Sequence, residues 1–212
     1  TQLAEGLRTL RRKRRIVGGI RQITRAMKLV SAAKLKRATA RWEQASYYCA
    51  QLDGACARAA EAAGQRLLPL AELPGPGASA LLVIAGDKGL CGAYNASVVA
   101  RAAQFAAQRE AVSVFTVGGR TAELARQARL RVVRELPGLV DRLQGRDASE
   151  LAAELLARYR SGEVARVDVC YARFVSRLVY QPTVVTLLPM FAAPAEAAVA
   201  AALGDALFEP AP

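Results

Sequence analysis

The chain has 212 residues, of which 53% are hydrophobic, and it contains no histidine. This apolar share argues against wholesale disorder, and the length fits one domain with an extra element or two small domains. The missing histidine excludes Ser-His-Asp and Cys-His hydrolases, His-ligated zinc and imidazole acid–base steps. The formal net charge of +12 resides in residues 1–41, which contain thirteen Lys and Arg and one acid, whereas residues 42–212 contain seventeen of each sign.

Residues 1–64 are predicted to form one long helix, because the segment lacks proline and is rich in Ala, Arg, Lys and Gln. Apolar residues recur along it at helical spacing: Leu3, Leu7, Leu10, Val17, Ile20, Ile23, Met27 and Val30. The stripe is narrow, as in a coiled coil. Some sixty residues at about 1.5 Å each make a helix of about 90 Å, which a domain of this size cannot bury. We therefore expect the helix to project or to find a partner.

Two glycines interrupt this helical pattern. Gly18 and Gly19 should each cost about 1 kcal/mol relative to alanine in a helix interior. They predict either a bend or a close approach by another backbone, and the sequence leaves both open.

A segment rich in proline and glycine, residues 65–79, is predicted to be a linker. An α/β domain is expected over residues 80–194, and a short helix and tail over 195–212. The predicted strands cover 80–85, 112–117, 130–134, 167–175 and 178–188, and the predicted helices cover 95–109, 121–129 and 147–160. This alternation indicates a layered, mostly parallel, Rossmann-like sheet and leaves an antiparallel edge open. Pro182 suggests an edge strand, and Asp147 with Glu150 predicts a capping box.

A glycine-rich turn follows the first strand, where a phosphate-binding loop would lie. Its glycines are spaced G-x-x-G-x-x-G, which is not the G-x-G-x-x-G of the dinucleotide fingerprint. It is not a P-loop either, because Lys88 is followed by Gly89 rather than by serine or threonine. A tight strand-to-helix turn is the favoured interpretation. Cys91 lies near a predicted helix N-terminus, but no base is available to assist it as a nucleophile. We therefore expect no catalytic residue and no cofactor.

The four cysteines contain no C-x-x-C pair and predict neither a metal site nor a disulfide. On a helix Cys49 and Cys56 would lie about 10.5 Å apart along the axis, too far for a bond between them. Free thiols in a reducing compartment are expected. The longest uncharged run, residues 178–195, contains three prolines and does not predict a membrane span, and the N-terminus does not resemble a signal peptide.

Three interpretations of the basic helix remain open. It is a solvated face, a phosphate-binding arm for nucleic acid or an anionic membrane, or a shaft that pairs with a second helix and moves past acidic partners. Against nucleic acid, no aromatic residue lies among the basic residues before Trp42. A nucleotide-binding α/β domain with a basic tail is a further alternative.

Three segments resemble, in order, the γ subunits of F-type ATP synthases. QITRAMKLVSAAKLKRA at residues 22–38 is similar to the family's Q-I-T-x-A-M-x-M-V-[AS]-A-[AS]-K-L-[RK]-[RK]-A. DKGLCGAYN at 87–95 is similar to its D-[RK]-G-L-C-G-x-[FY]-N, with Gly86 in place of the family's serine. A weaker F-x-S…P-T…L-L-P pattern recurs within 173–189. The family's long C-terminal helix is not among the 212 residues, so the apolar stripe is expected to lack that partner.

The resemblance implies a rotor rather than an enzyme. In the family, the N-terminal helix pairs with the C-terminal helix inside a ring of alternating α and β subunits. The α/β domain rests on the ε subunit and the membrane c-ring, and one copy serves each complex. Rotation driven by ions then changes the conformation of each catalytic β subunit. The resemblance places the chain on the cytoplasmic face of a bacterial inner membrane, or the equivalent organelle membrane, held through its partners without lipid insertion.

The resemblance also assigns two groups of residues. The expected partner contacts, facing acidic residues of β, are Ile23, Thr24, Arg25, Met27, Lys28, Lys34, Lys36 and Arg37. The residues expected to shape the foot domain, without binding phosphate, are Gly86, Asp87, Lys88, Gly89, Cys91 and Gly92.

Overall fold

The computed structural model describes residues 2–63, 77–142, 145–176 and 178–190. The chain divides into two compact units, residues 1–62 and residues 63–212. The predicted linker lies outside the described residues as far as residue 76, and the predicted tail at 195–212 lies wholly outside them. Among the described helices, none combines the length and the apolar character needed to cross a bilayer.

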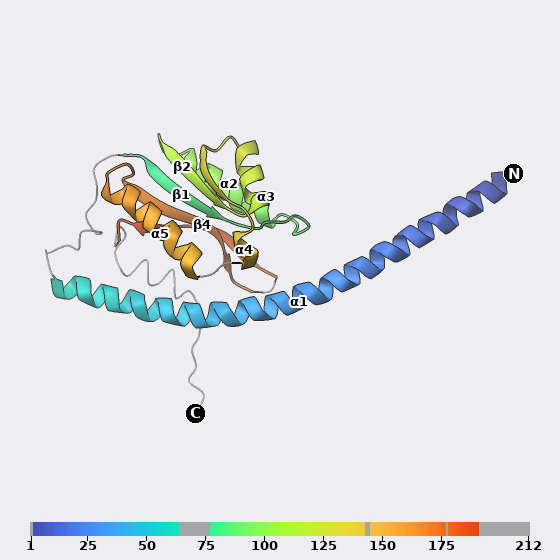
Figure 1. Cartoon of the computed structure of the whole chain (residues 1–212), viewed down its shortest axis with the longest axis horizontal. Helices are drawn as coiled ribbons and strands as arrows, with labels where there is room; N and C mark the ends of the chain where they lie inside the picture. Colours follow the sequence, from blue (N-terminus) through green and yellow to red (C-terminus); the bar gives the residue numbers. More distant parts are fainter. Residues whose placement is uncertain (1, 64–76, 143–144, 177, 191–212) are drawn as a thin grey trace, which may run out of the picture. The chain divides into compact units, whose positions relative to one another are not determined.

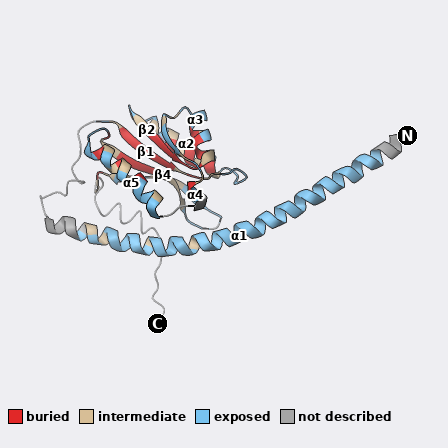
Figure 2. Ribbon diagram, in the orientation of Figure 1, coloured by how far each residue is buried: buried red, intermediate tan, exposed pale blue. Residues whose placement is uncertain are grey.

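The first unit is a single helix, α1, from Gln2 to Ala63 (Figure 1), which confirms the long helix predicted from the sequence. The described side chains of α1 are exposed along almost its whole length (Figure 2). Gly18 and Gly19 do not interrupt it, and a β-carbon added at either would meet no atom within 4 Å. In most protein helices the larger part of the stability comes from tertiary packing, so an exposed helix depends on its own propensity and on partners.

The second unit contains a five-stranded sheet in the order β3-β2-β1-β4-β5 (Figure 1). The strands are β1 Ser79–Ile84, β2 Val112–Val117, β3 Val132–Leu136, β4 Arg166–Phe174 and β5 Tyr180–Leu188. All neighbours are parallel except β4 and β5, which are antiparallel. The predicted mostly parallel α/β fold is confirmed. Pro182 lies in the edge strand β5, as predicted, where a missing N–H need not weaken a second ladder.

Helices cover both faces of the sheet. They are α2 Tyr94–Ala106, α3 Gly119–Gln127, α4 Leu139–Arg142 and α5 Gly145–Arg160. Helices α2 and α3 lie on one face and α4 and α5 on the other (Figure 1). The one-turn helix α4 was not predicted, because four residues are too short for a periodic pattern to emerge.

The predicted capping box of α5 is wrong. The helix begins at Gly145, which places Asp147 within its first turn rather than at its cap. Glu150 accepts a hydrogen bond from Arg146 Nε at 2.8 Å, as an i,i+4 ion pair on the exposed surface. Asp147 still sits where the helix dipole favours a negative charge.

Alternate residues of β1 pack into two cores. Leu81 and Val83 face α2, where they join Val98, Ala102 and Phe105. The opposite core centres on Phe115 of β2, which is fully buried. Leu151 and Leu155 of α5 close this core. A strand that is apolar on both faces is typical of the centre of a parallel sheet, and each such buried side chain contributes about 1.5–3 kcal/mol.

Candidate functional site

The predicted partner-contact residues lie on an exposed part of α1 that has two opposite faces. Because successive residues turn by about 100° around a helix, Ile23 and Met27 share one face. Arg25 and Lys28 lie on the opposite face. All four are exposed. This part of α1 therefore offers an apolar stripe and a basic stripe back to back.

The three cations further along α1 divide between these faces. Lys34 lies seven residues, or two turns, beyond Met27, so it continues the apolar stripe. Arg37 continues the same stripe from Val30. Lys36 lies eight residues beyond Lys28 and remains on the basic face. The eight predicted residues thus form two surfaces rather than one.

Thr24, also in the predicted set, forms a hydrogen bond within the helix. Its Oγ1 donates to the carbonyl oxygen of Ile20 at 2.9 Å. This bond to the preceding turn satisfies the hydroxyl without a partner chain. Its role as a partner contact remains a prediction.

The basic surface of α1 carries no compensating acids over most of its length. Between Gly6 and Trp42 the sequence contains thirteen Lys and Arg and neither Asp nor Glu. The stretch supplies no acidic partner of its own, and like charges at i,i+4 repel. Such a surface attracts acidic partners most strongly at low ionic strength.

The glycine-rich turn after β1 is closed by a carboxylate of the chain itself. Asp87 Oδ1 accepts hydrogen bonds from the backbone N–H of Gly119 at 2.9 Å and of Gly138 at 2.6 Å. Gly119 is the first residue of α3. A helix N-terminus attracts anions, and here Asp87 occupies the place that a phosphate oxygen would take. This geometry supports a structural turn and disfavours a nucleotide site.

Gly86 lies in close contact with Asn95. The Gly86 N–H donates to Asn95 Oδ1 at 2.7 Å, and a β-carbon on Gly86 would lie 2.8 Å from the same oxygen. Asn95 is buried and also donates from Nδ2 to the carbonyl of Lys88 at 2.9 Å. A serine at this position would displace Asn95, which gives a physical reason for the glycine.

The remaining loop residues lie toward solvent. Lys88, Gly89 and Cys91 are exposed, and a β-carbon on Gly89 would meet nothing within 4 Å. Gly92 has φ +61°, a conformation that favours glycine. Cys91 Sγ accepts a bond from Asn95 Nδ2 at 3.3 Å. Leu90, in the left-handed region at φ 59°, was not singled out and is almost fully exposed.

Gly118 was missed by sequence reasoning. It has φ +106°, and a β-carbon there would lie 2.7 Å from the carbonyl oxygen of Gly86. The close approach of these two backbones brings the turns after β1 and β2 together, where Thr121 Oγ1 donates to the same carbonyl at 3.3 Å. The sequence signal for this contact was the glycine pair, Gly118 and Gly119, that follows the second predicted strand.

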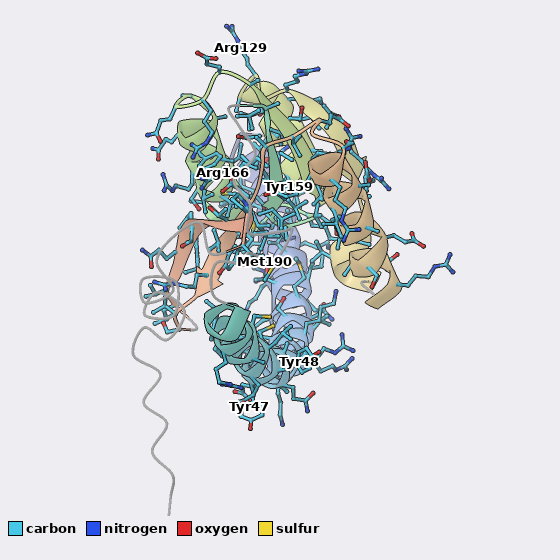
Figure 3. All side chains as sticks on the ribbon, turned by 90° about the vertical axis from the view of Figure 1, so that its left-hand side faces the viewer. Tyr47, Tyr48, Arg129, Tyr159, Arg166 and Met190 are labelled. Carbon is cyan, nitrogen blue, oxygen red and sulfur yellow. The ribbon has the colours of Figure 1, made fainter. Side chains whose placement is uncertain are left out.

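A buried ion pair on β4 was also missed. Asp168 is fully buried, and Arg166 Nε donates to both of its carboxylate oxygens at 2.9 and 2.8 Å. Thr186 on β5 donates a hydrogen bond from its hydroxyl to Asp168 Oδ1 at 2.9 Å. Arg166 is labelled in Figure 3. Each charge is satisfied by a specific partner, so this cluster holds β4 and β5 in register.

Cys170, on the same face of β4 as Asp168, is structural. Burial raises the pKa of its thiol to about 11, and Sγ lies 3.5 Å from the carbonyl oxygen of Val98. The protonated thiol is a poor nucleophile. Among the described residues, no group of three His, Cys, Asp or Glu side chains could hold a metal ion.

A family model described as ATP synthase matches residues 6–212. The chain is 36% identical over 205 residues to the ATP synthase gamma chain of Pelotomaculum thermopropionicum, a match that covers 96% of this chain and 72% of the relative. It is 32% identical to that of Heliobacterium modesticaldum, covering 91% of this chain and 67% of the relative. For Synechococcus elongatus the identity is 35%, with coverage of 87% and 60%. The chain thus spans about 60–72% of the length of these relatives.

A solved structure shares the fold. A chain in the cryo-EM structure of the central stalk and c-ring of the Tetrahymena thermophila mitochondrial ATP synthase matches with a TM-score of 0.55 and 24% identity. The match covers 79% of this chain and 72% of that one.

Proposed function

This chain belongs to the ATP synthase γ-chain family, and from that premise we propose that it is the rotating central-stalk subunit, coupling an ion-driven c-ring to the catalytic β subunits. It is a non-catalytic subunit of the complex, as are the relatives that carry the gamma-chain name. Its contribution would be mechanical. An asymmetric shaft changes a neighbour's conformation only by contacting its alternative states differently.

The observation that carries the proposal is the two-faced exposed surface of α1. The basic face with Arg25, Lys28 and Lys36 suits acidic residues on β, whereas the apolar face with Ile23 and Met27 suits a packed helix. The absence of acids between Gly6 and Trp42 leaves this charge for partners to neutralise. The α/β domain would then rest on the ε subunit and the c-ring, with one copy in each complex.

The proposed location follows from these partners. The chain would be peripheral, on the cytoplasmic face of a bacterial inner membrane, held there by the c-ring and the ε subunit. The net positive charge lies in residues 1–41, the part proposed to meet the β subunits. Residues 42–212, which include the α/β domain, are neutral overall.

Charge reversal on the basic face tests the proposal. In the assembled complex, Arg25→Glu with Lys28→Glu should lower ATP-driven ion pumping relative to ATP hydrolysis, because the shaft would then repel acidic residues of β. Nucleotide affinity of the complex should not change. The pair Arg129→Glu and Arg131→Glu, both exposed on the second unit, matches the change in net charge. Full coupled turnover in the α1 variant, or equal loss in both variants, would count against the proposal.

A further inference from the structure

The apolar stripe on α1 changes face near residue 18. Leu7, Leu10 and Val17 follow one heptad pattern, and all three are exposed. Continued at the same spacing, the pattern would reach residues 21, 24 and 28. These positions are occupied by polar side chains: Arg21, Thr24 and Lys28.

The next apolar residues stand one position earlier than the heptad pattern requires. Ile20, Ile23 and Met27 occupy these positions, and all are exposed. A shift of one residue rotates a row by about 100° around the helix. Ile16, which is also exposed, stands four residues before Ile20 and begins this same row. The first row (residues 7–17) and the second row (residues 16–30) therefore point in different directions on a regular helix. To bring both into one line, the helix must change its winding locally.

Gly18 and Gly19 directly follow Ile16 and Val17, where the second row begins and the first row ends. Neither has a positive φ, and a β-carbon on either would meet no atom within 4 Å, so nothing in the described residues requires glycine there. Each glycine instead lowers the stability of the helix and widens the backbone conformations available to it. Val17 and Ile20, which flank the pair, are β-branched and are weak helix formers.

Repulsion between like charges weakens α1 on both sides of the glycines, as it does elsewhere between Gly6 and Trp42. Arg11 and Arg15 stand at i,i+4 before the glycines, and Arg21 and Arg25 stand at i,i+4 after them. No acid compensates them between Gly6 and Trp42. Helix propensity and the change in the apolar stripe thus both point to residues 18–19, and charge repulsion weakens the helix on either side of them.

We propose that Gly18–Gly19 is a soft joint in α1, where the helix opens and rewinds more readily than on either side. The joint lets the first and second apolar rows come into one line, which a stiff regular helix would prevent. This inference concerns the helix itself and stands whether or not the chain serves as a rotor.

Amide hydrogen exchange on the full 212-residue chain, read at single-residue resolution, tests the joint. Amides of residues 18–23 should exchange on the order of tenfold faster than those of residues 30–40, because opening a turn that contains glycine costs less. In the Gly18→Ala, Gly19→Ala variant this difference should disappear, while far-UV circular dichroism shows that α1 remains helical.

A relocated glycine pair is the matched control. Ala32 and Ala33 are exposed on α1, and Ala32→Gly with Ala33→Gly in the alanine-filled variant should create a new fast region at residues 32–37. Uniform exchange over residues 12–40 in the parent chain would overturn the proposal. So would a fast region that stays at 18–23 after both glycines are replaced.

Discussion

Asp87 leaves the carboxyl end of β1 and accepts hydrogen bonds from backbone N–H groups that follow β2 and β3, those of Gly119 and Gly138. One side chain thereby joins the turns after three adjacent parallel strands. Its second oxygen, Oδ2, is buried and has no hydrogen-bond partner among the described residues. Hydrogen bonds to an ionised acceptor contribute more than neutral ones, and a buried N–H without its acceptor is costly.

We therefore expect Asp87→Ala to lower the free energy of unfolding of the second unit by about 3 kcal/mol. Asp87→Asn should cost less, because its carbonyl oxygen replaces Oδ1 while its amide takes the place of the unpaired Oδ2. Calorimetry of the full chain is the suitable measurement, because the single tryptophan, Trp42, lies in α1 and does not report on the sheet. The control is Glu110→Ala, which removes an exposed carboxylate and should change stability by less than about 0.5 kcal/mol. Equal stability of Asp87→Ala and the control would contradict the role given to Asp87.

Sequence reasoning identified the turn after β1 but not the partners of Asp87. The glycines and the position between strand and helix are local signals, so a structural turn was predictable. Gly119 and Gly138 lie 32 and 51 residues away from Asp87 in the sequence, and only the strand order brings them to it. The same holds for Asp168 and Thr186, which meet through the antiparallel register of β4 and β5. Pairing across strands has no periodic trace in one sequence.

At the scale of elements, the long helix and the strands were predictable because both have strong periodic or compositional signals. Strand β2 matches the predicted range at both ends, and α1 covers all the described residues of its predicted range. Helix α5 begins two residues before the predicted cap, because Gly145 and Arg146 take helical geometry despite the glycine. Local propensity located these elements, and tertiary context set their ends.

The charge distribution gives α1 an unusual dependence on salt. Between Gly6 and Trp42 all thirteen ionised side chains are cationic, so their mutual repulsion opposes helix formation. Screening shortens the Debye length from about 30 Å at 0.01 M to about 10 Å at 0.1 M. Raising the salt concentration across this range should therefore increase the helical signal of the full chain at 222 nm.

A charge-balanced variant provides the control for this effect. Replacing Arg21 and Lys28 with glutamate places acids at i,i+4 before and i,i+3 after Arg25, which should stabilise the helix at low salt and reduce the salt response. A parent chain whose helicity falls with added salt would show that repulsion does not limit α1. The exposed side chains of Tyr47 and Tyr48 on the later part of α1 (Figure 3) are the same in the parent chain and in the variant.

At the scale of the whole molecule, the two units present different surfaces. The α/β unit buries its sheet on both faces and pairs many of its surface charges, as between Arg158 and Glu154. The helix α1 exposes both its apolar rows and its cations. Large exposed apolar surfaces mark interaction sites, so α1 is the part of the chain that most needs other subunits. The composition alone indicated this division, because it placed the whole net charge in the first fifth of the sequence.

The most direct test of the central-stalk assignment is native mass spectrometry of the complex that this chain forms in its own cells, purified through a tag on the chain. We expect an assembly containing one copy of this chain with three α and three β subunits, and we expect collisional activation to release a chain with this sequence. Recovery of the chain alone, or of a complex without α and β subunits, would contradict the assignment.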